Sequence, residues 1–194
     1  MAVKKLARLG TGLLLVLLVL GVSSAAQSSV GPAAAPSATS LKVQDRSHDN
    51  DNPDNQLYAL YQIINTGTTT VPMSELTMRY WFSNTSTTDP PVFACDWAAV
   101  NCSNITSTIV TLSPPRTLAD HYLQLGFTAA AGSLAPGQSS GEIQTRIHDV
   151  NYSNFDTTNS YSFISDESFV YKDTQTVTLY LNGVLIWGTE PSAS

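Results

Sequence analysis

Beyond residue 40, apolar and polar residues alternate along most of the chain, which is typical of β-strands that bury one face. No window shows the three-to-four-residue apolar spacing of an amphipathic helix. In residues 76–82, Leu76, Met78, Tyr80 and Phe82 alternate with Thr77, Arg79 and Trp81. In residues 176–181, Val177, Leu179 and Leu181 alternate with Thr176, Thr178 and Tyr180, and Ile109 and Leu112 flank a β-branched run. The pattern predicts an all-β domain.

Turn-forming residues separate these segments. They are NTG at 65–67, the proline pairs at 90–91 and 114–115, APG at 135–137 and NG at 182–183. Asn-Gly between two alternating segments is the strongest short hairpin signal in the chain. Many short strands with such punctuation predict an antiparallel β-sandwich, a jelly roll or a related Greek key.

One predicted strand, residues 141–148, carries an unusual row of polar side chains. Its alternation places Ile143, Thr145 and Ile147 on one face and Glu142, Gln144, Arg146 and His148 on the other. Side chains two apart on a strand lie roughly 7 Å from each other, so Gln144 and Arg146 are neighbours on an open sheet face. From spacing alone, a solvated sheet face and a binding face remain equal alternatives.

A positively charged start and an apolar run predict a secretory signal peptide at residues 1–26. The cations Lys4, Lys5 and Arg8 precede the run at 13–22, and small residues follow it up to Ala26. The alternative is an uncleaved anchor or lipoprotein-like retention. The run is short for a membrane span, and no cysteine follows it to take a lipid. We therefore expect a secreted protein with no membrane contact after cleavage.

The remaining chain divides into a linker and one domain. Residues 27–40 are almost wholly Ser, Ala, Pro, Gly, Val and Thr, a composition typical of a flexible linker. Residues 41–191 suit a single domain, which can bury roughly 70% of its unfolded surface without help from a metal.

Charge argues against one class of partner. The chain has 9 Lys and Arg against 15 Asp and Glu. Loss of the three cations in residues 1–26 leaves 6 against 15, a formal charge of 6 − 15 = −9. A nucleic-acid-binding protein needs a basic face, so we expect no nucleic-acid partner.

The two cysteines, Cys95 and Cys102, lie seven residues apart. In an exported protein this spacing favours a local disulfide, with a pair of buried thiols as the alternative. Such a bond would hold the segment that carries Asp96 and Trp97. A cysteine nucleophile is disfavoured because no histidine lies in a supporting motif.

Two other polar features favour ordinary roles. The Asp-rich stretch 45–55 lacks the glycine and terminal glutamate of a calcium-binding hand, which favours a solvated edge or loop. His48, His121 and His148 lack metal-ligand spacing, which favours exposed or hydrogen-bonded histidines.

From residue 41 to residue 191 the chain resembles a family 3 carbohydrate-binding module, the cellulose-binding domain of cellulases and cellulosomal scaffolds. The resemblance covers the whole predicted domain and implies a nine-stranded jelly-roll sandwich that binds insoluble cellulose and has no catalytic activity of its own. The motifs that carry it are LKVQ (41–44), NTG (65–67), SELTMRYWF (74–82), CDWAAVNCSN (95–104), LSPP (112–115), ADHYLQLGF (119–127), GSLAPGQS (132–139), GEIQTRI (141–147), SNFDTTNSYSF (153–163) and YLNGVLIWGTEP (180–191).

The resemblance implies a flat binding strip on the surface. Its members here are Asp96, Trp97, Arg146 and Tyr152, and a polar anchor row includes Asn55 and Gln144. Tyr152 stands where relatives often have Trp and offers a smaller platform. Two plainer alternatives are that Trp97 belongs to the core and that Tyr152 packs locally in its loop.

A structural calcium ion is the second implied feature. Its ligands here would be Ser83, Thr85, Asp156, Asn159 and Ser160. Relatives usually have carboxylates where this chain has Thr85 and Ser160, and calcium prefers several charged oxygens. Asp156 and Asp89 are the acids that could compensate.

Two rival functions remain open. A glycosidase needs two carboxylates across a cleft, and no local motif here pairs two acids. The other rival is a module of the same fold that does not bind cellulose and instead supports a catalytic domain or senses polysaccharide outside the cell. Asp96, Trp97 and Arg146 favour direct binding.

Overall fold

The computed structural model describes residues 39–84, 86, 88–166 and 168–194. The predicted signal peptide and residues 27–38 of the predicted linker lie outside these ranges. Within them, no helix is long and apolar enough to cross a membrane.

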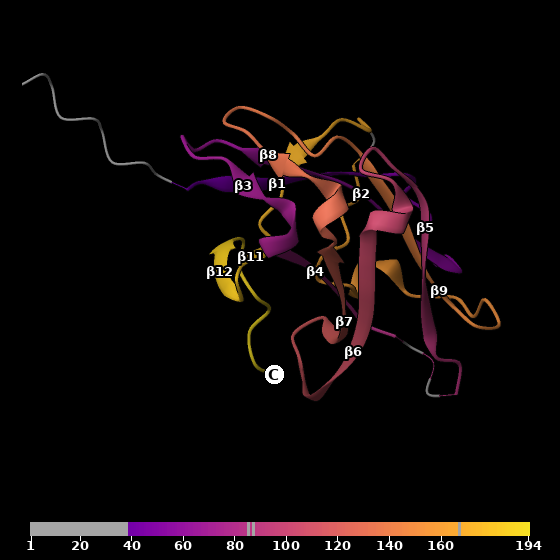
Figure 1. Ribbon diagram of the computed structural model, residues 1–194. Helices are drawn as coiled ribbons and strands as arrows, with labels where there is room; N and C mark the ends of the chain where they lie inside the picture. The colour runs from indigo at the N-terminus through magenta and orange to yellow at the C-terminus, as the bar shows by residue number, and fades with distance from the viewer. Residues whose placement is uncertain (1–38, 85, 87, 167) are drawn as a thin grey trace, which may run out of the picture. The chain divides into compact units, whose positions relative to one another are not determined.

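Two five-stranded antiparallel sheets form a β-sandwich (Figure 1). The first sheet contains, in spatial order, β10 (Lys172–Asp173), β1 (Leu41–Arg46), β2 (Gln56–Asn65), β9 (Ile143–Asp149) and β5 (Pro91–Ala98). The second contains β12 (Val184–Trp187), β11 (Val177–Leu181), β4 (Leu76–Phe82), β7 (Ala119–Phe127) and β6 (Ile105–Arg116). The predicted antiparallel jelly-roll class is confirmed.

Short elements complete the domain. A two-stranded sheet pairs β3 (Val71–Pro72) with β8 (Ser133–Leu134). Four 3₁₀ helices lie in connections: η1 (Met73–Glu75), η2 (Cys102–Asn104), η3 (Ala129–Ala131) and η4 (Thr157–Asn159). The described residues thus form twelve strands where about nine were predicted, and β3, β8 and β10, each of two residues, account for the difference.

The core lies between the inner faces of the two sheets, where the predicted alternation is realised. In β4, Leu76, Met78, Tyr80 and Phe82 are all buried, and in β9 Ile143, Thr145 and Ile147 are buried. The Asn182–Gly183 turn joins β11 to β12, and both residues have positive φ (49° and 79°). This is the conformation that favours Asn-Gly in a two-residue hairpin.

Asp45 corrects one prediction. It was assigned to a solvated stretch, but it lies in β1 on the inward side and is only 2% exposed. It lies near Tyr61 and Tyr80, and the Asp45 Oδ1 and both phenol oxygens are buried without a hydrogen-bond partner. Burial raises the pKa of Asp45 well above its usual range, despite hydrogen bonds from the Arg46 and Leu60 backbone that lower it. Only residues 48–55 of that stretch keep the expected surface position.

Around Trp81, the outer face of the second sheet is covered by its own side chains and by the C-terminal segment. Trp81 alternates outward as predicted, yet it is only 1% exposed. Its indole Nε1 donates to Thr178 Oγ1 at 3.0 Å, and Arg116 lies over its ring. Backbone contacts between residues 116–117 and 192–193 hold the C-terminal segment beside β6.

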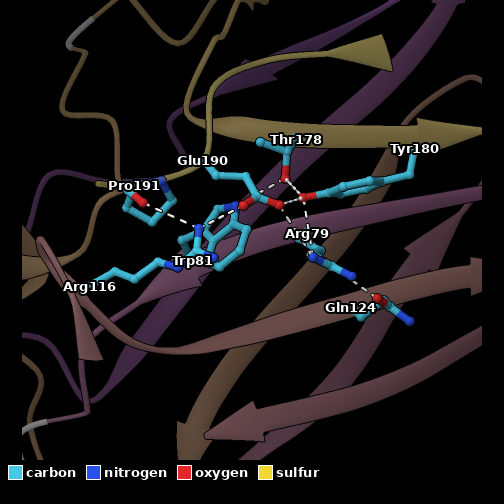
Figure 2. A network of polar contacts seen from close by, with 8 residues as sticks. All are labelled: Arg79, Trp81, Arg116, Gln124, Thr178, Tyr180, Glu190 and Pro191. Carbon is cyan, nitrogen blue, oxygen red and sulfur yellow. Dashed lines mark hydrogen bonds and ion pairs between the residues drawn. The ribbon is translucent and has the colours of Figure 1, made fainter. Parts of the chain in front are cut away.

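Glu190 joins this cover to the sheet. Figure 2 shows its carboxylate between Arg116, Tyr180 and Arg79. Arg116 Nη1 and the Tyr180 hydroxyl each donate to it at 2.6 Å, and Arg79 Nη1 lies 3.5 Å away. Burial would raise the pKa of Glu190, but the hydrogen bonds from Tyr180 and Arg116 and the charges of both arginines lower it overall.

We predict that Glu190→Ala lowers the free energy of unfolding by about 1 to 3 kcal/mol, because it leaves two arginines and a phenol without their acceptor. Glu190 has a lowered pKa in the folded state. Its contribution to the free energy of unfolding is therefore fully present above its pKa in the unfolded chain, and it is lost as the pH falls through its pKa in the folded protein. Urea denaturation at neutral and acidic pH measures both effects. Glu75→Ala, at an exposed acid, is the control, and equal losses in the two variants would contradict the prediction.

Candidate functional site

A β-bulge in β5 places Asp96 and Trp97 together at the surface. Opposite β9, Cys95 pairs with the inward-facing Thr145 and Trp97 pairs with the outward-facing Gln144, which leaves Asp96 as the extra residue. Without the bulge, Trp97 would lie opposite Ile143 and face the core. Trp97 is instead 50% exposed, which excludes the alternative that it is a core residue.

Asp96 contacts the predicted arginine across the strand boundary. Asp96 Oδ1 lies 3.2 Å from Arg146 Nε, an ion pair by distance without hydrogen-bond geometry. Arg146 Nη1 donates to Gln56 Oε1 on β2 at 3.0 Å. The guanidinium is therefore held between β5 and β2 rather than in a two-pronged contact with Asp96.

Tyr152 lies beyond the end of β9, in a turn with φ of 58°. Its ring is stacked on His148, the last outward-facing residue of β9, with ring centroids 4.3 Å apart and planes within 1°. Tyr152 is 46% exposed, so it packs locally on one side and remains accessible to solvent.

These groups form one row along the outer face of the first sheet, which we call the strip: Trp97, the Asp96–Arg146 pair, and Tyr152 on His148. The row follows the outward positions 144, 146 and 148 of β9, which are spaced about 7 Å apart along the strand. Figure 1 shows β5 and β9 side by side over most of their length. The structure thus brings together all four residues predicted for the strip.

The predicted anchor residues lie near the two ends of this row, Gln144 opposite Trp97 and Asn55 near His148. Gln144 Nε2 donates to Glu142 Oε1. Asn55 lies half-buried immediately before β2, the strand whose first residue pairs with His148.

A polar cluster that the sequence reasoning missed surrounds Glu142. Arg46 donates to its carboxylate at 2.9 Å and the Tyr171 hydroxyl donates at 2.7 Å, while Arg46 also lies over the Tyr171 ring. Burial would raise the pKa of Glu142, but hydrogen bonds from Gln144, Tyr171 and Arg46 lower it overall.

Three further surface residues were also missed as members of the face. Gln56 supports Arg146, and His48 is stacked on Tyr58 with ring centroids 4.1 Å apart. Tyr58 pairs with Arg146 in the β2–β9 register. The alternation of β2 could have pointed to Gln56 and Tyr58, because both occupy outward positions beside the strip.

The predicted disulfide between Cys95 and Cys102 is present. Cys95 packs against the core and Cys102 begins η2. The loop that the bond closes contains the bulge, so the covalent link holds the segment that carries Asp96 and Trp97.

The residues predicted for calcium supply few charged oxygens. Ser160 Oγ accepts from Ser83 N at 3.3 Å, and the Asp156 carboxylate accepts from Thr158 at the start of η4. Thr85 lies outside the described residues. Asn159 belongs to η4. Among the described residues, no group of three or more His, Cys, Asp or Glu could hold a metal ion. A donor set with one carboxylate, already hydrogen-bonded, fits calcium poorly.

Comparison with known proteins gives a family match over residues 42–188, described as "Cellulose binding domain". Endoglucanase A of Paenibacillus lautus is 40% identical over 157 residues, which is 80% of this chain and 22% of that enzyme. The other enzyme relatives are likewise several times longer than the matched segment.

Solved structures agree with the sequence match. A biomass-sensing module from putative Rsgi-like proteins of Clostridium thermocellum superposes with a TM-score of 0.74 and 32% identity, over 79% of this chain and all of that one. The CBM3b module of the scaffoldin subunit ScaA from Acetivibrio cellulolyticus gives a TM-score of 0.73 and 34% identity, over 78% of this chain and 97% of that one.

We predict that the double variant Cys95→Ser/Cys102→Ser loses about 2.5 kcal/mol of unfolding free energy. Without the bond, the unfolded chain regains the conformational entropy that the closed loop had removed. Urea denaturation measures the loss. The mass of the intact wild-type chain with and without reductant provides the control for bond formation. Equal stability of the two proteins would show that the bond does not constrain the unfolded chain.

Proposed function

Because the chain belongs to the family 3 carbohydrate-binding modules, the cellulose binding domain family, we propose that its strip binds the flat face of an insoluble β-glucan, crystalline cellulose in particular. Modules of this family are non-catalytic binding domains, and carbohydrate binding follows from membership. The observation that supports the finer proposal is the row of two exposed aromatic rings with an ion pair between them on one sheet face.

Glucan chains in a crystal expose flat sugar faces whose axial C–H groups can stack on aromatic rings. Trp97 and Tyr152 supply such rings, and each keeps close to half of its surface accessible. The stack of Tyr152 on His148 leaves its opposite ring face available for a sugar. The open sheet face suits a crystal surface better than a single chain in a cleft.

The Asp96–Arg146 pair lies between the two aromatic ends. An exposed ion pair contributes only about 0 to 1 kcal/mol to stability, so the planar guanidinium of Arg146 and the hydroxyl-binding atoms of the pair are the better reason for its position. Gln56 fixes one end of the guanidinium, while Gln144 and Asn55, near the two ends of the row, can serve as anchors for sugar hydroxyls.

We propose that the protein is secreted and meets its ligand outside the cell. The signal-peptide pattern at 1–26 and the disulfide support an oxidising compartment. A sensing role for the same strip is the second candidate, because a biomass-sensing module is among the structural relatives. Both roles need polysaccharide binding, so they share the test below.

We predict that Trp97→Ala and Tyr152→Ala fold normally but bind microcrystalline cellulose at least about fivefold more weakly, since each stacked ring contributes on the order of 1 to 3 kcal/mol. Depletion of protein from solution by cellulose, chitin and xylan measures binding and identifies the preferred polymer.

Val184→Ala is the matched control, because Val184 is 66% exposed but belongs to β12 on the other sheet. It should bind as the wild type does. Unchanged depletion by both aromatic variants, with wild-type binding intact, would rule out the strip.

Structural calcium, which the resemblance implies, is supported weakly by the donors at Ser83 and Asp156. We predict the same melting temperature in excess calcium and in excess EDTA, because one hydrogen-bonded carboxylate gives little affinity for a hard cation. Thermal melts monitored by circular dichroism test this. A rise in melting temperature that depends on calcium concentration would show that the site functions.

A further inference from the structure

The turn after β9, residues 149–153, carries Tyr152 and is fastened at few points. Val150 N donates to the Pro90 carbonyl at 3.1 Å, and Tyr152 N donates to the Asp149 carbonyl at 2.9 Å. His148 Nδ1 lies 2.9 Å from the Asp149 carbonyl oxygen, and the side-chain contacts of Asn151 and Ser153 converge on one side chain in the segment before β5.

That side chain is Asp89, which is only 4% exposed. Its carboxylate accepts from Asn151 N at 2.9 and 3.1 Å, from Asn151 Nδ2 at 3.0 Å and from Ser153 Oγ at 2.7 Å. These donors belong to the residues immediately before and after Tyr152. A buried carboxylate with several donors is a strong local constraint, because charged hydrogen bonds are stronger than neutral ones.

Asp149 lies next to this contact and has no such donors. It is 0% exposed, and both of its carboxylate oxygens lack a hydrogen-bond partner. The groups that face it are Asp89, His121, His148 and the Asn84 amide. Asn84 Nδ2 donates one hydrogen to the Asp89 carbonyl at 3.0 Å, and the same amide lowers the pKa of Asp149 without offsetting its burial.

We propose that Asp89 is a positioning residue for the strip, holding the Asn151–Ser153 turn so that Tyr152 lies on His148, and that ionisation of the neighbouring Asp149 weakens this hold. The proposal rests on the proposed function in one respect, that Tyr152 binds polysaccharide. The physical cause is a second negative charge in a buried position beside the Asp89 carboxylate, where water screens it poorly.

The direction of the pH effect follows from Asp149. Burial first, and then the charge of Asp89, raises the pKa of Asp149 from 3.8 to about 6, although Asn84 and the two histidines lower it. An acid with a raised folded pKa stabilises the fold below its unfolded pKa, and this contribution is lost as the pH rises through the folded value. The turn is therefore held best at low pH and is held less well at pH 7.

Amide exchange of the free protein tests the hold without any polysaccharide. The protection factor of Asn151, corrected for the intrinsic pH dependence of exchange, should fall between pH 4 and pH 7 in the wild type. It should stay constant in Asp149→Asn, and Asp89→Ala should lose protection at every pH. A constant wild-type protection factor, or an unchanged one in Asp89→Ala, would overturn the proposal.

Binding to microcrystalline cellulose across the same pH range tests the consequence for the strip. Wild-type binding should weaken as the pH rises, whereas Asp149→Asn at pH 7 should bind as the wild type does at low pH. Glu75→Gln changes an exposed acid that is distant in sequence from Asp149, and it should keep the wild-type dependence of binding on pH. A pH dependence of binding that persists in Asp149→Asn would refute the role of Asp149.

The two readouts separate this proposal from the proposed function. A protein that binds no polysaccharide but shows the expected exchange pattern would refute the cellulose assignment and keep the Asp89 contact. Strong wild-type binding, with Asp89→Ala and wild type equal in both assays, would keep the cellulose assignment and refute the role of Asp89.

Discussion

The bulge in β5 is the constraint on which the surface of the first sheet depends. A regular strand has a period of two, so adjacent residues such as Asp96 and Trp97 would face opposite sides of the sheet. One extra residue opposite β9 shifts this phase and moves the indole from the core side to the outer side. Directly after the bulge, Ala98 pairs with the inward-facing Ile143 and faces the core again. The disulfide closes the loop that contains the bulge.

The outer faces of the two sheets differ in how far their aromatic side chains are covered. On the second sheet, Trp81 is covered by Arg116, and Glu190 ties the C-terminal segment down over the strands. On the first sheet, Trp97 and Tyr152 keep close to half their surface exposed. Both faces combine arginine, acid and aromatic side chains, so composition alone does not distinguish a covered face from an open one. The two faces differ because the C-terminal segment runs beside β6 of the second sheet.

Local patterns in the sequence predicted the strands and turns, and the family resemblance predicted which residues form the strip. The alternation in β4 and β9 and the Asn182–Gly183 turn depend on neighbouring residues, so the sequence contains their causes. The burial of Asp45 and Trp81 depends on which distant strands and segments cover them. Alternation identified the side of the strand in the case of Trp81 but could not identify its cover.

The same limit explains what was missed within the site. The support of Arg146 by Gln56 joins residues 90 positions apart, and the contacts of Asp89 with the Tyr152 turn span more than 60. Neither pairing can be predicted from the spacing of neighbouring residues. Each follows only once β2, β9 and β5 are known to be neighbours, which is a property of the sheet order.

The two ends of the strip are held by different kinds of force, and this gives them different sensitivities. Trp97 lies within a covalent loop and a continuous strand pairing, so moving it requires breaking β5 from β9. Tyr152 lies beyond the strand pairing, in a turn whose side-chain contacts depend on the charge state of a few buried acids. Local openings in proteins are drawn from such weakly paired segments. Under the proposed function, a ligand that stacks on both rings would depend on the solution conditions mainly through the tyrosine end of the strip.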